Sequence, residues 1–516
     1  MDKININFSL SNDWFLNRDA LVFGVFEGDS GPCGINFKKE TIEDNFHKID
    51  PIFKNIKSHL EQGDFKAKFG EIFLTYLFDG SPVKRVIVIG LGKKLEFNNE
   101  KLRQAGAKVA QYARDLGVKN LTTTIFGSPE MDAKSRFRNL MEGISLSLYR
   151  FDKFKSRNEG DEKKVVEVEF LFPENVEINS EEWEDELKRS QHIISAVYLA
   201  RNLANNPASV VTPEFLAKVA REIAKSSTAF TCDVFKREEL EKMGMNAVLD
   251  VGKGSDSEPH FIVLNYKPAN AENKKPIVLV GKGVCFDSGG LSIKPSENMD
   301  EMKMDMAGAA VVLAALKAAS NLKLPINIIG VIPAVENIPG SKSYRPGDII
   351  KTYSGKTIEV LNTDAEGRII LADALSYAVK NFDPGMVIDL ATLTGACIVA
   401  LGHHYGVVLG NDNKIATDLI EAGKKTNEKI WPLPLDDDFK KQIESEIADM
   451  KNYGGRSAGA ITAAMLLKEF VGNIPWCHID IAGPAILSEK KPYSPKGGSG
   501  FGVRLLVEFL EKYLEI

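Results

Sequence analysis

Short apolar runs rich in β-branched residues alternate with segments of helical periodicity through most of the chain, and this alternation limits the fold more than any other feature. A short run of this kind that ends at a glycine or a turn signal is typical of a buried strand. Strands that alternate with helices predict an α/β fold, in which helices cover the faces of a sheet. The expected strands include 83–91, 165–172, 261–265, 277–280, 326–332 and 386–390, and the expected helices include 98–116, 187–204, 305–319 and 369–379.

The chain is long enough for more than one domain. Its 516 residues predict two to four domains, at ~100–200 residues each. The stretch 173–186, PENVEINSEEWEDE, is acidic and weakly apolar, so it is the best candidate for a domain boundary or the start of a connecting helix. After the helix that follows, Thr212 and Pro213 have the residue types of an N-cap and a first helical position.

Charge and cysteine content narrow the classes of protein. The net charge of -6 does not favour binding to nucleic acid or to an anionic membrane, although a local basic patch stays possible. The five cysteines form no CxxC pair, which argues against a disulfide framework and a thiolate zinc site. The first ten residues are polar, and no apolar run reaches the ~20 residues of a membrane helix. We therefore expect a cytoplasmic protein without a membrane partner.

Two glycine motifs carry little information. Gly90-Leu91-Gly92 follows an expected strand, but Leu95 stands where a dinucleotide fingerprint needs its third glycine. The sequence VGKG at 251–254 and 280–283 is not a phosphate-binding P-loop.

The second VGKG begins a stretch in which charged residues follow a buried strand. From residue 280 the chain reads VGKGVCFDSGGLSIKP, with Lys282, Asp287 and Lys294 among several glycines. Ligand sites of α/β sheets lie beyond the carboxyl ends of strands, and glycines let the backbone approach a ligand closely. The alternative is an ordinary surface loop with solvated charges.

Three more acidic positions stand out further along the chain. Asp305 lies between two methionines, as a helix N-cap or as a carboxylate that faces a pocket. In NTDAEGR, at 362–368, Asp364, Glu366 and Arg368 are two residues apart, and in an extended chain they would share one side. Arg368 would then lie at a helix start. A salt-bridge network is the alternative reading of this segment.

Together these segments contribute four carboxylates, which cannot all ionise in one confined place without compensating positive charge. Two divalent cations would supply that charge. Oxygen ligands suit Mg or Mn, and zinc also accepts Asp and Glu. The chain has no HExxH motif, so a zinc protease with histidine ligands is not expected.

The motifs resemble those of the cytosolic leucine aminopeptidases. The resemblance rests first on VGKG, FDSGG and SIKPS at 280–296, MKMDMAGAA at 302–310 and NTDAEGR at 362–368. It extends to RNLANNP at 201–207, VVTPE at 210–214, DLATLTGA at 389–396, GAITAAMLL at 459–467 and HIDIAG at 478–483. It is strong over residues 195–516 and loose over 1–170. It implies a smaller N-terminal α/β, macro-like domain at 1–173, a linker helix region at 174–204 and a catalytic peptidase domain with a mixed central sheet at 205–516.

The resemblance also implies roles for individual residues. One metal ion would be held by Lys282, Asp287, Asp305 and Glu366, and the other by Asp287, Glu366, and the side chain and backbone oxygen of Asp364. Zn or Mn is the expected metal, with Mg or Co as alternatives. The implied catalytic groups are Lys294, for the oxyanion, and Arg368, which would anchor a bicarbonate ion as proton shuttle. The implied substrate-binding residues are Lys294, Met302, Asp305, Asn362, Thr392 and Gly395.

The expected activity is release of N-terminal leucine and similar apolar residues from peptides, by attack of a water that bridges the metals. The resemblance further implies a homohexamer and a role in peptide turnover. The alternatives are a two-metal phosphoesterase, a DNA-binding role that the net charge does not support, and a preference for cysteinyl-glycine.

Cys285 departs from the resemblance, which implies a non-thiol residue at this position. It would either make the site sensitive to oxidation or serve as a small buried residue.

Overall fold

The computed structural model describes residues 6–11, 13, 18–33, 46–76, 83–156, 164–172 and 181–514, with only the backbone described for 46–51. These residues form two compact units. Unit 1 comprises Met1–Ser195 and Lys490–Pro495, and unit 2 comprises Ala196–Glu489 and Lys496–Ile516. The division falls inside the long helix α4 (Glu181–Asn205), within the predicted linker at 174–204. The predicted boundary at residue 173 lies outside the described residues.

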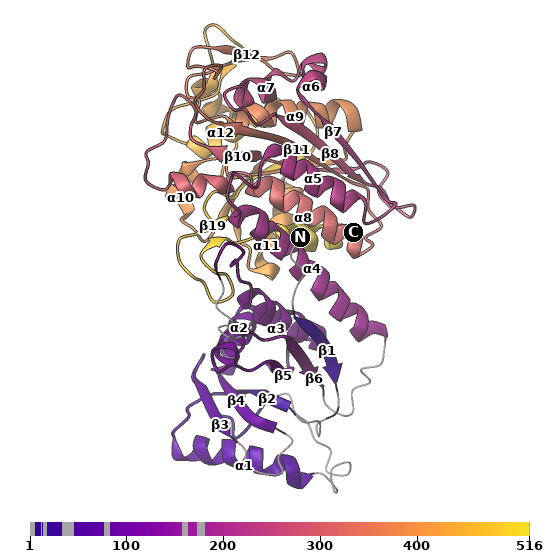
Figure 1. The fold of residues 1–516 in the computed structure, drawn as a ribbon, viewed down its shortest axis with the longest axis vertical. Helices are drawn as coiled ribbons and strands as arrows, with labels where there is room; N and C mark the ends of the chain where they lie inside the picture. Colours follow the sequence, from indigo (N-terminus) through magenta and orange to yellow (C-terminus); the bar gives the residue numbers. More distant parts are fainter. Residues whose placement is uncertain are drawn as a thin grey trace. The chain divides into compact units, whose positions relative to one another are not determined.

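Unit 1 has a six-stranded sheet in the order β1-β6-β5-β2-β4-β3. All neighbouring strands are parallel except β3 and β4. Alternate residues of β2 pack with α1 in one apolar core, and Figure 1 shows the α2–α3 pair on the other face of the sheet. The elements are β1 (Asn7–Ser11), β2 (Arg18–Phe26), α1 (Phe46–Gln62), β3 (Ile72–Tyr76), β4 (Val83–Gly92), η2 (Lys94–Glu96), α2 (Asn99–Asp115), β5 (Asn120–Thr124), α3 (Ala133–Ser147) and β6 (Glu167–Leu171).

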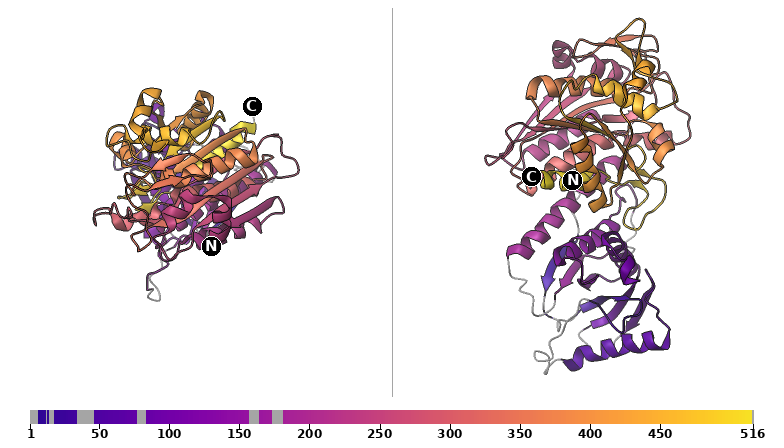
Figure 2. Two further views of the ribbon diagram at one scale, coloured as in Figure 1. Left: turned by 90° about the horizontal axis from the view of Figure 1, so that it is seen from above. Right: turned by 180° about the vertical axis from the view of Figure 1, so that it is seen from behind.

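Unit 2 contains the larger sheet, which is mixed. Its nine strands have the order β16-β15-β18-β14-β9-β11-β8-β7, with β10 paired to β11. The four central strands, β18, β14, β9 and β11, are parallel, and antiparallel pairs flank them. Figures 1 and 2 show helices on both faces, with α5, α8 and α11 on one and α7, α9 and α12 on the other. The α/β class with a mixed central sheet is thus confirmed.

The first half of unit 2 contributes the strands nearest to the predicted site. Its elements after α4 are α5 (Pro213–Ala224), β7 (Phe230–Phe235), α6 (Arg237–Met243), α7 (Asn246–Gly252), β8 (His260–Tyr266), β9 (Ile277–Gly281), β10 (Gly283–Asp287), η3 (Met299–Met304), α8 (Ala307–Asn321), β11 (Ile328–Asn337), β12 (Ile349–Lys351) and β13 (Thr357–Glu359).

The second half completes the sheet and its helical layers. Its elements are α9 (Gly367–Phe382), β14 (Met386–Ala391), α10 (Gly395–Leu401), β15 (Gly406–Gly410), α11 (Asn413–Thr426), β16 (Ile430–Pro432), η4 (Asp437–Ile443), β17 (Met450–Lys451), α12 (Gly459–Lys468), β18 (Trp476–Asp480), β19 (Ile486–Leu487), β20 (Gly497–Gly498) and α13 (Val503–Leu514). Within the described part of the chain, no helix is long and apolar enough to cross a membrane.

Local sequence signals account for several boundaries. The Thr212 hydroxyl accepts a hydrogen bond from the backbone N–H of Phe215 at 3.3 Å and caps α5, whose first residue is Pro213. Asn98 caps α2 in the same way, by accepting from Lys101 N–H. The strands predicted at 83–91, 277–280 and 386–390 are confirmed as β4, β9 and β14.

Of the two readings of Asp305, the helix N-cap is wrong, because Met306 occupies the N-cap position of α8 and makes no side-chain cap. The other reading is confirmed, since Asp305 lines a cavity. The segment 362–368 is not extended, because Ala365 N–H donates to the Asn362 carbonyl in a turn, and α9 begins at Gly367. Arg368 does lie in the first turn of α9, as expected.

Candidate metal centre

The predicted site lies where parallel strands of unit 2 end side by side. Lys282 directly follows β9, and Thr392 directly follows the neighbouring β14. Asp287 is the last residue of β10, which pairs with β11 on the other side of β9. After Lys282 the chain continues directly into β10 of the same sheet, so Lys282, Asp287 and Thr392 all lie at this edge, where α/β sheets bind their ligands. This topology, rather than any single loop, brings the charged side chains together.

Lys282 is the centre of one group of contacts. Its ammonium Nζ lies 2.7 Å from Asp305 Oδ2 and 2.8 Å from Glu366 Oε1, and it donates to the Thr392 carbonyl at 2.9 Å. The Thr392 hydroxyl also donates to Asp305 Oδ1 at 2.6 Å. Lys282, Asp305 and Glu366 are all buried. The lysine therefore joins two carboxylates beneath the surface of the crevice.

Lys294 forms the second group. Its Nζ lies 2.8 Å from Asp287 Oδ2 and 2.5 Å from Asp364 Oδ1. The Lys294 side chain is 21% exposed, whereas that of Lys282 is 3% exposed. Lys294 can therefore reach a molecule in the crevice, and Lys282 is placed to act within the carboxylate cluster.

Two glycines are required by the close packing of these groups. A Cβ atom at Gly367 would lie 2.7 Å from Cε of Lys282. Gly289 has φ of +87°, and a Cβ there would lie 2.8 Å from Oδ1 of Asp364. Side chains at these positions would push Lys282 or Asp364 out of the cluster.

The four carboxylates of the site differ in how readily each of them ionises. Burial, together with the nearby Glu366 and Asp305 charges, raises the pKa of Asp287 well above its usual value. Burial also raises the pKa of Asp305 to about 6, against the attraction of Lys282, and raises that of Asp364. Burial opposes ionisation of Glu366 too, but Lys282 and Lys294 hold its pKa below the usual value. The two lysines therefore do not neutralise the four carboxylates.

This arrangement fits divalent cations. One oxygen each of Asp287, Asp364 and Glu366 lies within 4.8 Å of the others, a spacing that a metal ion could bridge. Oε2 of Glu366 is buried and accepts no hydrogen bond from any described residue. A buried carboxylate oxygen without a donor is costly unless a cation binds it. The donor set of carboxylates and one amine is compatible with Mn, Zn or Mg.

The Arg368 guanidinium has a different hydrogen-bond partner from those of the two lysines. Its NH1 group donates to the Asn452 carbonyl at 3.1 Å, and among the described residues its Nε has no hydrogen-bond partner. Burial lowers the pKa of the guanidinium, while Glu366 and Asp480 favour its charged form. A small anion would satisfy the free N–H of Arg368.

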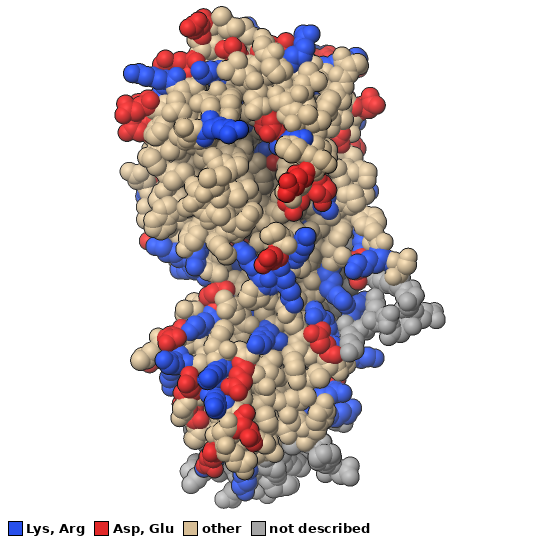
Figure 3. Space-filling model, turned by 90° about the vertical axis from the view of Figure 1, so that its left-hand side faces the viewer, with Lys and Arg blue, Asp and Glu red and all other residues tan. Residues whose placement is uncertain are grey.

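The charged groups line one side of a cavity of about 1220 Å³. All the predicted site residues line it except Glu366, which is buried beneath its floor. Met302, Ile398, Val399 and Ile461 form apolar parts of its wall. Figure 3 shows the side of unit 2 on which Figure 1 places α10, and uncharged side chains cover most of it. The cavity thus combines a polar floor with an apolar wall.

Cys285 is wholly buried in β10, and burial raises the pKa of its thiol well above the usual value. A buried neutral thiol reacts slowly, so its surroundings favour the role of a small buried residue over that of an oxidation-sensitive group.

Supporting residues were missed at the sequence level. Asn337, at the end of β11, donates to Asp287 Oδ1 at 2.8 Å and to the Thr363 carbonyl at 2.9 Å. Asn452 donates to the Asn362 carbonyl at 2.6 Å. These amides hold the turn that carries Asp364 against the strand end that carries Asp287. For Asn337 the sequence did hold one local sign of such a role, because it is a polar residue at the end of an apolar strand.

Comparison with known proteins gives a consistent result. Residues 198–507 match the catalytic domain of the cytosol aminopeptidase family, and residues 22–158 match that family's N-terminal domain. A probable cytosol aminopeptidase of Syntrophotalea carbinolica is 48% identical over 450 residues, which cover 87% of this chain and 90% of the relative. One from a Geobacter species is 42% identical over 510 residues, which cover 99% and 100%.

Solved structures agree over nearly the whole chain. A mutant of tomato leucine aminopeptidase superposes with a TM-score of 0.85 at 30% identity, and the match covers 99% of this chain and 97% of that one. The bottromycin maturation enzyme BotP in complex with Mn superposes with a TM-score of 0.82 at 31% identity, covering 96% and 99%.

Proposed function

Since this chain belongs to the cytosol aminopeptidase family and is an aminopeptidase, a hydrolase, we propose that it releases N-terminal leucine and similar apolar residues from peptides. One observation carries the proposal. Four carboxylates, two lysines and an arginine converge at the ends of β9, β10 and β14, at the floor of a cavity whose wall is partly apolar or, for Glu366, directly beneath that floor. Met302 belongs to the wall that would contact the first side chain of the substrate.

The residues of the cluster would hold two divalent ions, Zn or Mn in preference to Mg or Co. Lys282, Asp287, Asp305 and Glu366 would hold one, and Asp287, Asp364 and Glu366 the other. Such a pair of ions lowers the pKa of a water molecule and polarises a carbonyl group. Lys282 would have to lose its proton to serve as a ligand, because an ammonium has no lone pair.

Lys294 and Arg368 would act on the substrate side. The Lys294 ammonium is the more exposed of the two lysines, so it is placed to stabilise the oxyanion that forms at the scissile carbonyl. Arg368 would bind bicarbonate through its free N–H and so place a proton acceptor in the cavity. Asn362, Thr392 and Gly395 line the same cavity and would contact the peptide backbone of the substrate.

The test compares leucine p-nitroanilide with its N-acetyl derivative and with p-nitrophenyl phosphate. We expect hydrolysis of the free-amine substrate alone, because an aminopeptidase must recognise the α-amine. Equal turnover of the acetylated compound would contradict an exopeptidase role, and turnover of the phosphate ester alone would favour a phosphoesterase. Hydrolysis of cysteinyl-glycine, measured in parallel, shows whether the enzyme prefers this dipeptide to the leucine substrate.

Three further features of the proposal rest on the resemblance. They are a homohexamer, a cytoplasmic location with a role in peptide turnover, and a linker region at 174–204 that joins an N-terminal domain at 1–173 to a catalytic domain at 205–516. Sedimentation equilibrium of the full chain tests the oligomer directly. A mass of six chains would support it, and a monomer mass would contradict it.

A further inference from the structure

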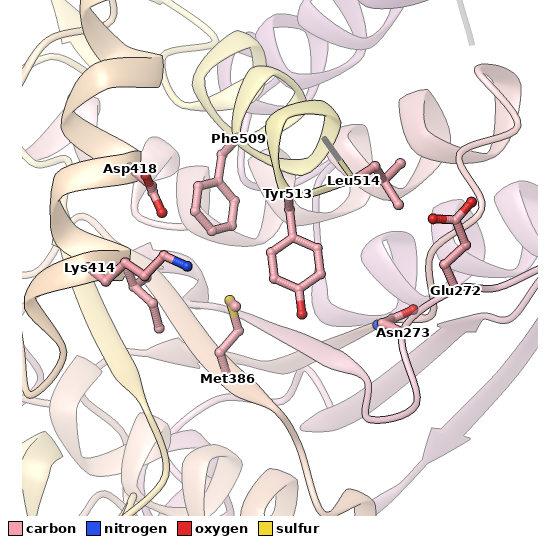
Figure 4. Close-up of a pocket in the computed structure, with 9 residues that line it drawn as sticks. Glu272, Asn273, Met386, Lys414, Asp418, Phe509, Tyr513 and Leu514 are labelled. Carbon is pink, nitrogen blue, oxygen red and sulfur yellow. The ribbon is translucent and has the colours of Figure 1, made fainter. Parts of the chain in front are cut away.

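The central strand β14 has a cavity at each of its ends. At its start, Met386 lines a pocket of about 360 Å³, and Figure 4 shows its sulfur and the ring of Tyr513 directed into that space. At its other end, Thr392 directly follows the strand and lines the cavity of the metal centre. Pairing of β14 with β18 stops at Ala391, so the segment 392–394 lies beyond the sheet and must be held by other contacts.

Thr392 contacts two groups of the metal centre at once. Its carbonyl accepts a hydrogen bond from Lys282 Nζ at 2.9 Å, and its hydroxyl donates to Asp305 Oδ1 at 2.6 Å. Lys282 follows β9 and Asp305 follows η3, so these two side chains reach each other from different elements. Thr392 supports the ion pair between them, whose length is 2.7 Å. A displacement of Thr392 would therefore disturb both groups.

A buried carboxylate of β18 holds the segment 392–394. Asp480, the last residue of this strand, has no exposed surface. Its Oδ1 accepts a hydrogen bond from the backbone N–H of Leu393 at 3.1 Å, and its Oδ2 accepts one from the Thr394 hydroxyl at 2.7 Å. Oδ1 also accepts from the backbone N–H of Ala482 at 3.1 Å, which fixes the direction of the carboxylate. Water cannot replace a buried acceptor, so these donors depend on Asp480.

The same carboxylate fixes the beginning of α10. The Thr394 hydroxyl is the N-cap of this helix, because it accepts from the backbone N–H of Cys397 at 3.1 Å while it donates to Asp480. Ile398 and Val399 of α10 form part of the apolar wall of the cavity. Asp480 is therefore connected to the wall as well as to the floor of the cavity.

We propose that Asp480 is a positioning residue of the metal centre. By holding the segment 392–394 in place, it keeps Lys282 and Asp305 at the separation that one shared metal ion needs. It does so through hydrogen bonds, and it touches neither the metal ligands nor the substrate. The expected effect of Asp480 on turnover rests on the proposed function, whereas its effect on metal affinity holds for any reaction that the site catalyses.

The experiment is calorimetric titration of the metal-free, full-length protein with Mn²⁺, together with kcat and KM for leucine p-nitroanilide. Asp480→Ala should weaken one of the two ions about tenfold and lower kcat/KM per folded molecule by at least as much. The affinity for the other ion should change little, because its proposed ligand Asp287 is held separately by Asn337, which donates to it at 2.8 Å.

The matched control is Glu428→Ala, which removes another buried carboxylate of unit 2. Glu428 accepts hydrogen bonds from the backbone N–H groups of Gly502 and Leu505, both at 2.9 Å, but does not line the cavity of the metal centre. This variant should lose stability in urea and keep both metal affinities and the kinetic constants per folded molecule. If Asp480→Ala behaves in the same way, Asp480 has only a structural role and the proposal is overturned.

Conservative variants separate hydrogen bonding from charge. Asp480→Asn keeps an oxygen for Leu393 and Ala482 and gains an amide that can donate to the Thr394 oxygen, so it should recover metal affinity to within about fivefold of the wild type. It removes the negative charge that favours the charged form of Arg368. An Asn variant as impaired as the Ala variant would show that this charge is what matters, and would contradict positioning by hydrogen bonds.

Thr394 provides the test if Asp480→Ala does not fold. Thr394→Val keeps the volume of the side chain but lacks the hydroxyl that donates to Asp480, so it should weaken the same metal ion. Thr394→Ser keeps the hydroxyl and should recover that affinity. Equal affinities in the Val and Ser variants would overturn the proposal. A wild type that binds both ions but does not hydrolyse leucine p-nitroanilide would contradict the proposed function alone, because the metal titrations would still decide the role of Asp480.

Discussion

At the residue scale, the two lysines of the metal centre differ in exposure, and this difference separates their proposed tasks. Lys282 is enclosed by Asp305, Glu366 and the Thr392 carbonyl, with 3% of its side chain exposed. Lys294 contacts Asp287 and Asp364 but keeps 21% of its side chain exposed. Replacing Lys282 should therefore change metal binding, and replacing Lys294 should change turnover.

Lys294→Ala is expected to lower kcat by about two orders of magnitude or more, because it removes a positive charge aimed at the developing oxyanion. The metal content should change little. Steady-state kinetics together with elemental analysis of the purified variant checks both expectations. Lys351→Ala, at an exposed position of β12, is the control. Unchanged turnover of Lys294→Ala would reject the role in oxyanion stabilisation.

Metal affinity should rise with pH. In the metal-free cluster the pKa of Asp287 is raised, and that of Asp305 is raised to about 6, both chiefly by burial. Carboxylates on three sides also raise the pKa of Lys282, against the effect of burial. Metal ions bind the deprotonated forms of these groups, so metal binding must release protons. As the pH falls below about 6, Asp305 also becomes protonated, and metal binding must then release its proton as well.

The measurement is titration with Mn²⁺ in two buffers of different ionisation enthalpy, at neutral pH and again below pH 6. The difference in heat between the buffers gives the number of protons released. We expect net release at neutral pH and weaker binding at the lower pH. Binding without proton release, and with the same affinity at both values, would show that the cluster holds no displaceable proton.

At the scale of elements, the site depends on how α9 is fixed to the rest of unit 2, since Glu366 and Arg368 lie at its first turn. Asp373, buried in α9, accepts hydrogen bonds from the backbone N–H groups of Ala247 and Val248 in α7, at 2.9 and 3.2 Å, and from Tyr353 at 2.7 Å. One carboxylate thus joins α9, the start of α7 and the segment between β12 and β13.

Asp373→Ala should destabilise the protein by about 2–4 kcal/mol, because it leaves three backbone donors without a partner and opens space in a packed region. The midpoint of urea denaturation should fall, while activity per folded molecule is retained. Asp383→Asn removes an exposed ion pair with Lys275 just after the same helix and keeps a residue type that tolerates the φ of +43° there, so it should change the free energy of unfolding by less than about 1 kcal/mol. Equal stability of the two variants would contradict this role of Asp373.

At the scale of the whole molecule, the alternation of strand and helix patterns was sufficient to predict the α/β class, and the strand ends at Lys282 and Thr392 were placed almost to the residue. Local patterns failed where geometry depends on distant contacts. The turn that places Asp364 is held by Asn337 and Asn452 from elsewhere in the chain. No periodicity could show those contacts, so the sequence offered only the extended arrangement as a way to bring Asp364, Glu366 and Arg368 to one side.

The same limit applies to the division into units. Residues 490–495 belong to unit 1 although they lie near the end of the chain. The Tyr493 hydroxyl donates to Glu100 Oε2 at 2.9 Å, and Gln111 Nε2 donates to the Pro492 carbonyl at 2.7 Å. Each bond joins residues more than 370 positions apart, a separation that composition and charge along the chain cannot reveal.

In the proposed function, the carboxylate cluster would hold two divalent ions on which hydrolysis depends. The most direct test is to remove metal with a chelator, then to return Mn²⁺ or Zn²⁺ stepwise while bound metal and leucine p-nitroanilide hydrolysis are measured on the same sample. We predict that activity is lost on chelation and returns as occupancy approaches two ions per chain, and that Glu366→Gln binds fewer ions and stays inactive. Full activity in protein shown to be free of metal would contradict the account.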